Sequence, residues 1–190
     1  MSKVSIQGNA SGTGTFTIAA PNSNSNQTLT LPDQTGTVIT TAGVPKSALP
    51  SGSVLQVVQG TLGSSVSTAT NNTWVTTGLA ASITPTSSSN KILVTVSGTG
   101  YTSGSAVQGV FTLYRGATNL STYGFTTVYA GSSSTQGGIT FSYLDSPSAT
   151  SSTTYTLYFS LSNSAGTLMF NSPSAFGQGN ATIILQEIAA

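Results

Sequence analysis

The side chains that could carry out acid–base chemistry are few in this 190-residue sequence, and they lie far apart. The chain has no His, and its three carboxylates, Asp33, Asp145 and Glu187, fall in three separate segments. His is the commonest general base, and cleavage of a glycosidic bond needs two carboxyl groups about 5–10 Å apart. Because no pattern brings two of these carboxylates together, we expect a protein that is not an enzyme.

The sequence also contains no clear motif for a metal, cofactor or nucleic-acid site. The chain has no Cys, which excludes a thiolate metal site and a disulfide framework. The glycine-rich segment 98–104 (GTGYTSG) misses the dinucleotide-binding spacing by one residue, and no helix pattern follows it. The four Lys and Arg residues are scattered, so they form no basic patch for phosphate groups. The sequence therefore predicts no metal, no cofactor and no nucleic-acid partner.

Two of the carboxylates have a structural interpretation instead. Asp145, in the segment YLDSPS, is expected to open a turn in which its side chain bonds the following backbone. Glu187 lies near the end of an apolar segment. We expect it either to be an exposed strand end or to contact Lys91 or Arg115, within one subunit or between subunits.

The aromatic side chains are the better candidates for recognition. The chain has seven Tyr and one Trp, and Tyr combines an apolar ring with a polar tip, which suits contact surfaces and sugar faces. Tyr101 lies in a Gly-rich segment with no alternation to bury it, which makes it the candidate for receptor contact. Trp74 follows an Asn pair and precedes an expected strand, so we expect it to pack in the core or between subunits.

The composition indicates a folded β protein with a hydroxyl-rich surface. Charged residues make up 4% of the chain, Ser and Thr together make up about a third, and the net charge is +1. A surface with so little charge gives little colloidal repulsion, so we expect the protein to be part of an assembly. Residues 1–20 have no basic segment followed by an apolar one, and all apolar runs are short. The sequence therefore predicts no signal peptide and no membrane insertion.

Period-two alternation dominates residues 53–190. In TTYTLYFSL, Tyr155, Leu157, Phe159 and Leu161 share one face. Gly-, Ser- and Pro-rich turns separate about nine such segments. We expect strands near 53–59, 71–77, 79–84, 91–98, 107–115, 120–130, 137–144, 153–162 with 166–170, and 180–188. This pattern predicts an antiparallel β-sandwich of jelly-roll type, with an up-and-down barrel as the alternative.

The final expected strand, in NATIILQEI, is apolar on both faces. A strand of this kind is buried on both faces. The opposite sheet covers one of them, and in a sandwich a neighbouring subunit can cover the other. Ile184 and Ile188 are therefore candidates for inter-subunit or core packing.

Residues 1–45 are predicted to form an extended, strand-rich arm, followed by a Pro-containing linker at 46–52 with one helical turn. The apolar side chains of this arm are too few to fill a core of their own. We expect them to be buried against sister chains or other virion proteins, the alternative being a tail without fixed structure. These docking and trimerisation candidates are Phe16, Ile18, Leu29, Leu31 and Val38.

Several segments resemble one class of viral protein. TLTLPDQTGT at 28–37 resembles the N-terminal strand-rich repeats of fibre and other virion proteins of tailed bacteriophages. The segment at 73–98, TWVTTGLAASITPTSSSNKILVTVSG, looks like the start of the C-terminal knob in that class. ITFSYLDSPSATSSTTYTLYF at 139–159 and ATIILQEIAA at 181–190 extend the resemblance over most of the chain.

The resemblance implies a homotrimeric virion component with a β-sandwich knob and no catalytic residues. The arm would attach to other virion proteins, and the knob would meet a glycan or protein of the host surface. Because no long repeated shaft separates arm from knob, we expect a short fibre, at the tail or baseplate of the particle. A capsid decoration or cement protein and a head-fibre trimer remain as alternatives, as does, less favoured, a secreted bacterial adhesin or lectin unit.

Overall fold

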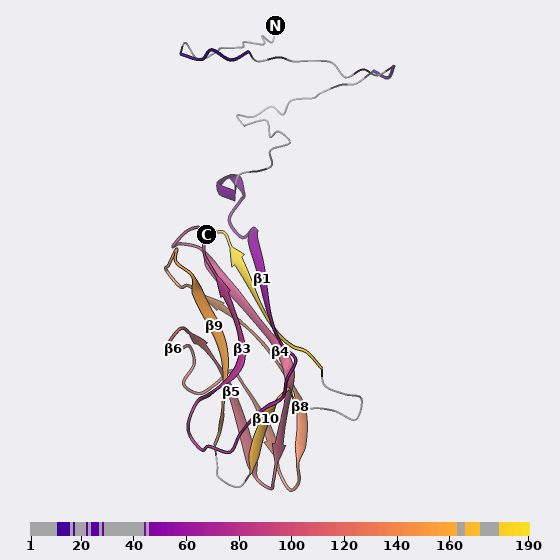
Figure 1. Cartoon of the computed structure of the whole chain (residues 1–190), viewed down its shortest axis with the longest axis vertical. Coiled ribbons are helices and arrows are strands. Elements are labelled where there is room, and N and C mark those ends of the chain that lie inside the picture. The colour runs from indigo at the N-terminus through magenta and orange to yellow at the C-terminus, as the bar shows by residue number, and fades with distance from the viewer. Residues whose placement is uncertain are drawn as a thin grey trace. The chain divides into compact units, whose positions relative to one another are not determined.

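Two antiparallel sheets face each other in the computed structural model of the chain (Figure 1). The structure describes residues 11–15, 17, 22, 24–26, 28, 44, 46–162, 166–171 and 179–190. The chain divides into two units, Met1–Ile39 and Thr40–Ala190. The docking and trimerisation candidates of the N-terminal arm lie outside the described residues, so their role stays a prediction: Phe16, Ile18, Leu29, Leu31 and Val38. Asp33 also lies outside the described residues.

Strands make up most of the unit Thr40–Ala190. One short 3-10 turn, η1 (Lys46–Ala48), precedes them at the position where the linker was expected to form a helical turn. No helix among the described residues is long and apolar enough to cross a membrane. The strands are β1 (Val54–Leu62), β2 (Val66–Thr68), β3 (Val75–Ile83), β4 (Lys91–Ser103), β5 (Val107–Arg115), β6 (Thr118–Asn119), β7 (Thr126–Ala130), β8 (Thr135–Asp145), β9 (Thr153–Leu161), β10 (Thr167–Phe170) and β11 (Ala181–Ile188).

The pairing of these strands gives a jelly roll. In the first sheet, β4 pairs with β8 on one side and with β11 and then β10 on the other, while β1 and β2 flank β11 and β10. In the second sheet the order is β3, β9, β5, and then β6 and β7 along the far side of β5. The strands β1, β11, β4 and β8 of the first sheet face β3, β9, β5 and β7 of the second, and the chain crosses repeatedly between the sheets, as in a jelly roll. The predicted all-β jelly-roll sandwich is therefore confirmed.

The core lies between the two sheets and follows the predicted alternation. Tyr155, Leu157, Phe159 and Leu161 are all fully buried. Phe111 lies at their centre, with its ring 6.2 Å from that of Phe159. Burial of each such side chain contributes about 1.5–3 kcal/mol to folding, so these inward faces hold the sheets together.

The sequence misplaced some strand boundaries for identifiable reasons. The segments 71–77 and 79–84 were expected as two strands, but they meet in one strand, β3, that bulges at Gly78. Gly78 has a φ of 79°, which only glycine adopts easily, and it interrupts the pattern without ending the strand. The segment 166–170 was expected to continue β9, but as β10 it crosses to the first sheet.

Candidate functional site

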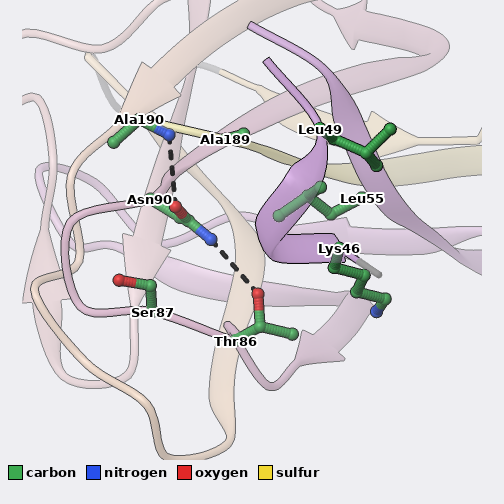
Figure 2. Close-up of a pocket in the computed structure, with 8 residues that line it drawn as sticks. All are labelled: Lys46, Leu49, Leu55, Thr86, Ser87, Asn90, Ala189 and Ala190. Carbon is green, nitrogen blue, oxygen red and sulfur yellow. Dashed lines mark hydrogen bonds between the residues drawn. The ribbon is translucent and has the colours of Figure 1, made fainter. Parts of the chain in front are cut away.

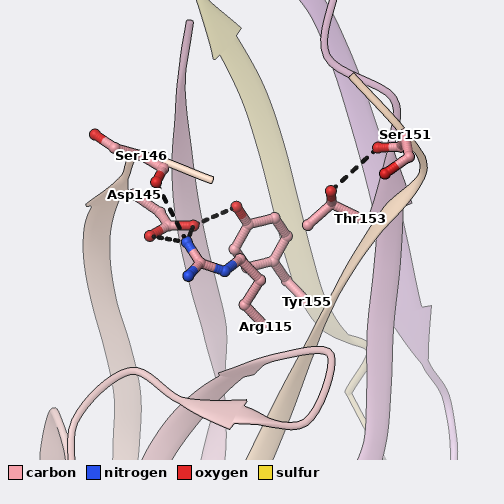
Figure 3. A network of polar contacts seen from close by, with 6 residues as sticks. All are labelled: Arg115, Asp145, Ser146, Ser151, Thr153 and Tyr155. Carbon is pink, nitrogen blue, oxygen red and sulfur yellow. Dashed lines mark hydrogen bonds and ion pairs between the residues drawn. The ribbon is translucent and has the colours of Figure 1, made fainter. Parts of the chain in front are cut away.

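Asp145, at the end of β8, ties the two sheets together (Figure 3). Its carboxylate is 5% exposed and accepts hydrogen bonds from Nη1 of Arg115 at 2.9 and 2.8 Å. Oη of Tyr155 donates to the same carboxylate at 2.6 Å. Asp145 was expected to bond the backbone that follows it. That prediction is wrong, because the Arg and Tyr side chains of the opposite sheet bind the carboxylate.

Tyr155 is a permanent donor in this network. Burial, and then the hydrogen bond to Asp145, raise the pKa of Tyr155 well above its ordinary value of 10.0. The phenol therefore keeps its proton over the whole range in which a protein is normally studied. Tyr155 is fully buried and Asp145 is almost so, and the contacts of Asp145 with Arg115 and Tyr155 join the two sheets.

Glu187 is fully buried in β11 and is surrounded by neutral donors. Its Oε1 accepts from the backbone N–H and Oγ1 of Thr86 at 2.6 and 2.7 Å, and from Nδ2 of Asn90 at 2.6 Å. Its Oε2 accepts from Nε2 of Gln56 at 2.6 Å. We call the three donor residues, Gln56, Thr86 and Asn90, the Glu187 cage. Burial opposes the charge, but the hydrogen bonds more than offset it and hold the pKa of Glu187 below its ordinary value of 4.5.

Both interpretations of Glu187 drawn from the sequence are wrong. It is not an exposed strand end, and it contacts neither Lys91, which is exposed, nor Arg115, which binds Asp145. The alternation along the strand did indicate that Glu187 is buried, since residue 187 falls on the same face as the buried Ile183. Its partners could not be foreseen, because Thr86 and Asn90 lie about a hundred residues earlier in the chain.

The two buried carboxylates share one row of the first sheet. Ile92 of β4 pairs with Glu187 on one side and with Asp145 on the other. Two strand spacings separate them by about 10 Å, a distance compatible with a glycosidase pair. However, the fully buried Ile92 stands between them, and neither carboxylate lines a cavity found in the described residues. Both carboxylates accept hydrogen bonds from side chains of the sandwich itself.

A cavity of about 440 Å³ lies beside the Glu187 cage (Figure 2). Asn90 lies at its wall, where Oδ1 accepts from the backbone N–H of Ala190 at 3.2 Å and Nδ2 donates to Oγ1 of Thr86 at 3.2 Å. Ser87, also in the lining, is paired with Ser89 at 2.8 Å. A ligand would have to break contacts that the protein already makes, so this cavity is the weaker candidate.

A second cavity, of about 370 Å³, lies over the outer face of the second sheet. Trp74 and Tyr123 both line it, and Tyr123 is 94% exposed. Trp74 was expected in the core or between subunits. It is half-buried and lies outside the hydrophobic core of the described residues. We call this space the Trp74 cavity; its remaining lining residues are Asn72, Val110, Thr122, Ser160, Leu161 and Ser162.

Tyr101 lies elsewhere, near the C-terminal end of β4 on the outer face of the first sheet, half-buried beside its register partners Gln136 and Met169. The sequence placed it in a loop because of its glycine neighbours. That placement is wrong. Gly98 and Gly100 instead make room inside the core, where a Cβ would approach Phe170 and Ile139 to 2.7 and 3.0 Å. A receptor contact by Tyr101 stays a prediction.

Ile184 and Ile188 lie on the same outer face of the first sheet and are half-buried. The register sets Val54 beside Ile188, and it aligns Val57, Gln186, Leu93 and Leu144 in the next row. Val57 is 57% exposed and Leu144 is 50% exposed. We call this group the aliphatic face; it comprises Val54, Val57, Leu93, Leu144, Ile184 and Ile188.

A comparison with protein-family models gave no match, and neither did one with curated proteins. The resemblance to phage fibre proteins therefore rests on the quoted segments alone. Within the described residues, no group of three or more His, Cys, Asp or Glu side chains could hold a metal ion. Among the described residues, the Trp74 cavity and the aliphatic face are surfaces open to another molecule.

Proposed function

We propose that the chain is a non-enzymatic structural protein of a tailed-phage virion, a homotrimeric short tail fibre whose β-sandwich head contacts the host surface. The observation that carries the proposal is the different chemistry of the two outer faces of the sandwich. One carries the aliphatic face, which suits burial against another copy. The other carries aromatic rings with hydroxyl and amide groups, which suits contact with a host molecule.

The aliphatic face supports self-association. Its side chains lie in adjacent rows across β1, β11, β4 and β8, on a chain whose remaining surface is rich in Ser and Thr. Burial of apolar surface is favourable by about 25 cal/mol per Å². Because the chain has a net charge of only +1, little repulsion opposes the approach of like copies. In a trimer, each copy would turn this face towards its neighbours.

The buried charges support a binding role over an enzymatic one. Asp145 and Arg115 neutralise each other across the sheets, and Glu187 is enclosed by its cage. The carboxylates in the described part of the head are thus used to hold the fold together. This leaves the aromatic and hydroxyl groups of the outer faces for recognition.

The mass of the full chain in solution tests the trimer. We expect native mass spectrometry and light scattering to give about 57 kDa, three times the 19.0 kDa of one chain. Val57→Asp places a charge in the aliphatic face and is expected to raise the concentration for half-dissociation at least tenfold. Thr127→Asp, at an exposed position of β7 on the other sheet, is the matched control. A wild-type chain that stays at 19.0 kDa over the micromolar range would contradict the trimer.

A further inference from the structure

We infer that the Trp74 cavity is a binding site for a neutral saccharide. The inference rests on the proposed function in one respect, since it names the host molecule that the head would contact. The cavity brings together Asn72 and Trp74 before β3, Val110 of β5, the turn at 121–124 and the end of β9. Its volume of about 370 Å³ lies within the range of small-ligand sites.

The two aromatic rings supply the stacking surfaces that a sugar needs. One face of a pyranose ring carries mostly C–H groups, and it packs on Trp and Tyr rings, whose polar edges stay in contact with water. Tyr123 is 94% exposed, so its ring is not used for packing within the described head. Trp74 is half-buried and lines the same cavity, so part of its indole is open to a ligand there.

The turn that presents Tyr123 is held in place before any ligand arrives. The N–H of Gly124 donates to the carbonyl of Ser121 at 3.1 Å, and Oγ of Ser121 donates back to the carbonyl of Gly124 at 3.0 Å. Oγ1 of Thr112, on β5, donates to the carbonyl of Ser121 at 2.7 Å. Gly124 has a φ of 81°, and a Cβ there would meet Val110. A preorganised turn loses little entropy on binding.

The opposite wall is fixed in the same way. Asn72 adopts a φ of 50°, in the left-handed region that Asn tolerates, and its N–H donates to the carbonyl of Leu161 at 2.8 Å. Its side-chain amide makes no hydrogen bond to the described residues, and the hydroxyl of Thr122 makes none either. Asn amides and hydroxyls both donate and accept, as the hydroxyl groups of a sugar do.

The cavity is lined by uncharged side chains, which favours a neutral saccharide over an acidic one. None of the side chains that line the cavity is Asp, Glu, Lys or Arg. Arg115, on the neighbouring part of β5, is already paired with Asp145. A sialic acid or uronic acid would bring a carboxylate with no cation to meet it. Hexoses and N-acetylhexosamines, which are neutral, match the lining.

The chain contains its own reporter, because Trp74 is its single Trp. We would titrate the full chain with glucose, galactose, mannose, N-acetylglucosamine and their oligomers, and follow Trp emission. A parallel series would use sialylated and uronic-acid-containing glycans. We expect a saturable change of emission with at least one neutral series, with a dissociation constant on the order of 1 mM or below, and no saturable change with the same glycan once it carries the acid.

Two variants locate the binding. Tyr123→Ala removes an exposed ring that nothing in the described head packs against, so the variant is expected to fold normally and to bind at least tenfold more weakly. Tyr129→Ala is the matched control, since this Tyr is 57% exposed on β7 but does not line the cavity. It is expected to bind as the wild type does. Equal binding by Tyr123→Ala and the wild type would overturn the site.

The remaining outcomes separate the site from the proposed function. If no neutral saccharide changes the emission while the full chain still binds host cells, the saccharide site is wrong and the fibre function stands. A host protein would then be the partner. If neutral saccharides bind as expected but virions lack the chain, the site stands and the fibre function is wrong. Binding of acidic glycans alone would also overturn the neutral class.

Discussion

Replacing Arg115 by Met is expected to lower the free energy of unfolding by about 3 kcal/mol. The variant leaves the carboxylate of Asp145, which is 5% exposed, with Tyr155 as its one remaining side-chain donor in the described network. Leaving a buried charge without its partner is among the costliest single changes in a protein. Urea unfolding followed by circular dichroism, at one fixed protein concentration, measures the effect.

Two further variants show whether the ion pair is the cause. Lys46→Met removes an exposed cation of η1, outside both sheets, and is expected to change the free energy of unfolding by less than about 0.5 kcal/mol. Adding Asp145→Asn to Arg115→Met removes the stranded charge, and it should restore a measurable part of the loss. Equal stability of Arg115→Met and the wild type would mean that the two sheets do not depend on this pair.

Replacing Glu187 by Gln is expected to lower the free energy of unfolding by about 2–3 kcal/mol. The carboxylate accepts four hydrogen bonds from Gln56, Thr86 and Asn90. An amide has the same shape, but it loses the charge and directs an NH₂ group at donors, so at least one buried donor is left without an acceptor. Gln136→Ala, at an exposed position of β8 away from the aliphatic face, is the matched control and should change stability by less than about 0.5 kcal/mol.

The effect of Glu187→Gln should depend on pH with a defined sign. The folded pKa of Glu187 is lower than its ordinary value of 4.5, so the unfolded chain takes up the proton first as the pH falls. The stabilisation is therefore complete above pH 4.5 and is lost as the pH falls through the folded pKa. The difference between wild type and variant should shrink as the pH falls below 4.5. A constant difference would contradict the assignment of the charge to Glu187.

The β-sandwich could be predicted from the local alternation of apolar and polar residues, because the inward-facing side chains of a strand recur at every second position. Tyr155, Leu157, Phe159 and Leu161 show this, since all four are fully buried. The alternation did not predict the strand correctly where a glycine, which has no side chain, lies within it. The sequence predicted two strands on either side of Gly78, whereas the structure has one strand, β3, with a bulge at this residue.

The candidate site could not be predicted to the same extent, because it is made by contacts between distant segments. Trp74 lies in the loop before β3 and Tyr123 in the loop between β6 and β7, and no spacing in the sequence relates them. The sequence singled out Trp74 for packing and Tyr101 for recognition, on the assumption that a Gly-rich segment is a loop. The glycines around Tyr101 serve the core instead, so the exposed ring had to be found from the structure.

The most direct test of the proposed function is the position of the chain in the intact particle. Electron cryomicroscopy of the phage encoded by the genome that carries this chain would show it. We expect threefold-symmetric density at the tail or baseplate, into which three copies of the β-sandwich fit with their aliphatic faces turned towards one another. Particles that lack the chain, or that carry it as separate single copies, would contradict the proposal.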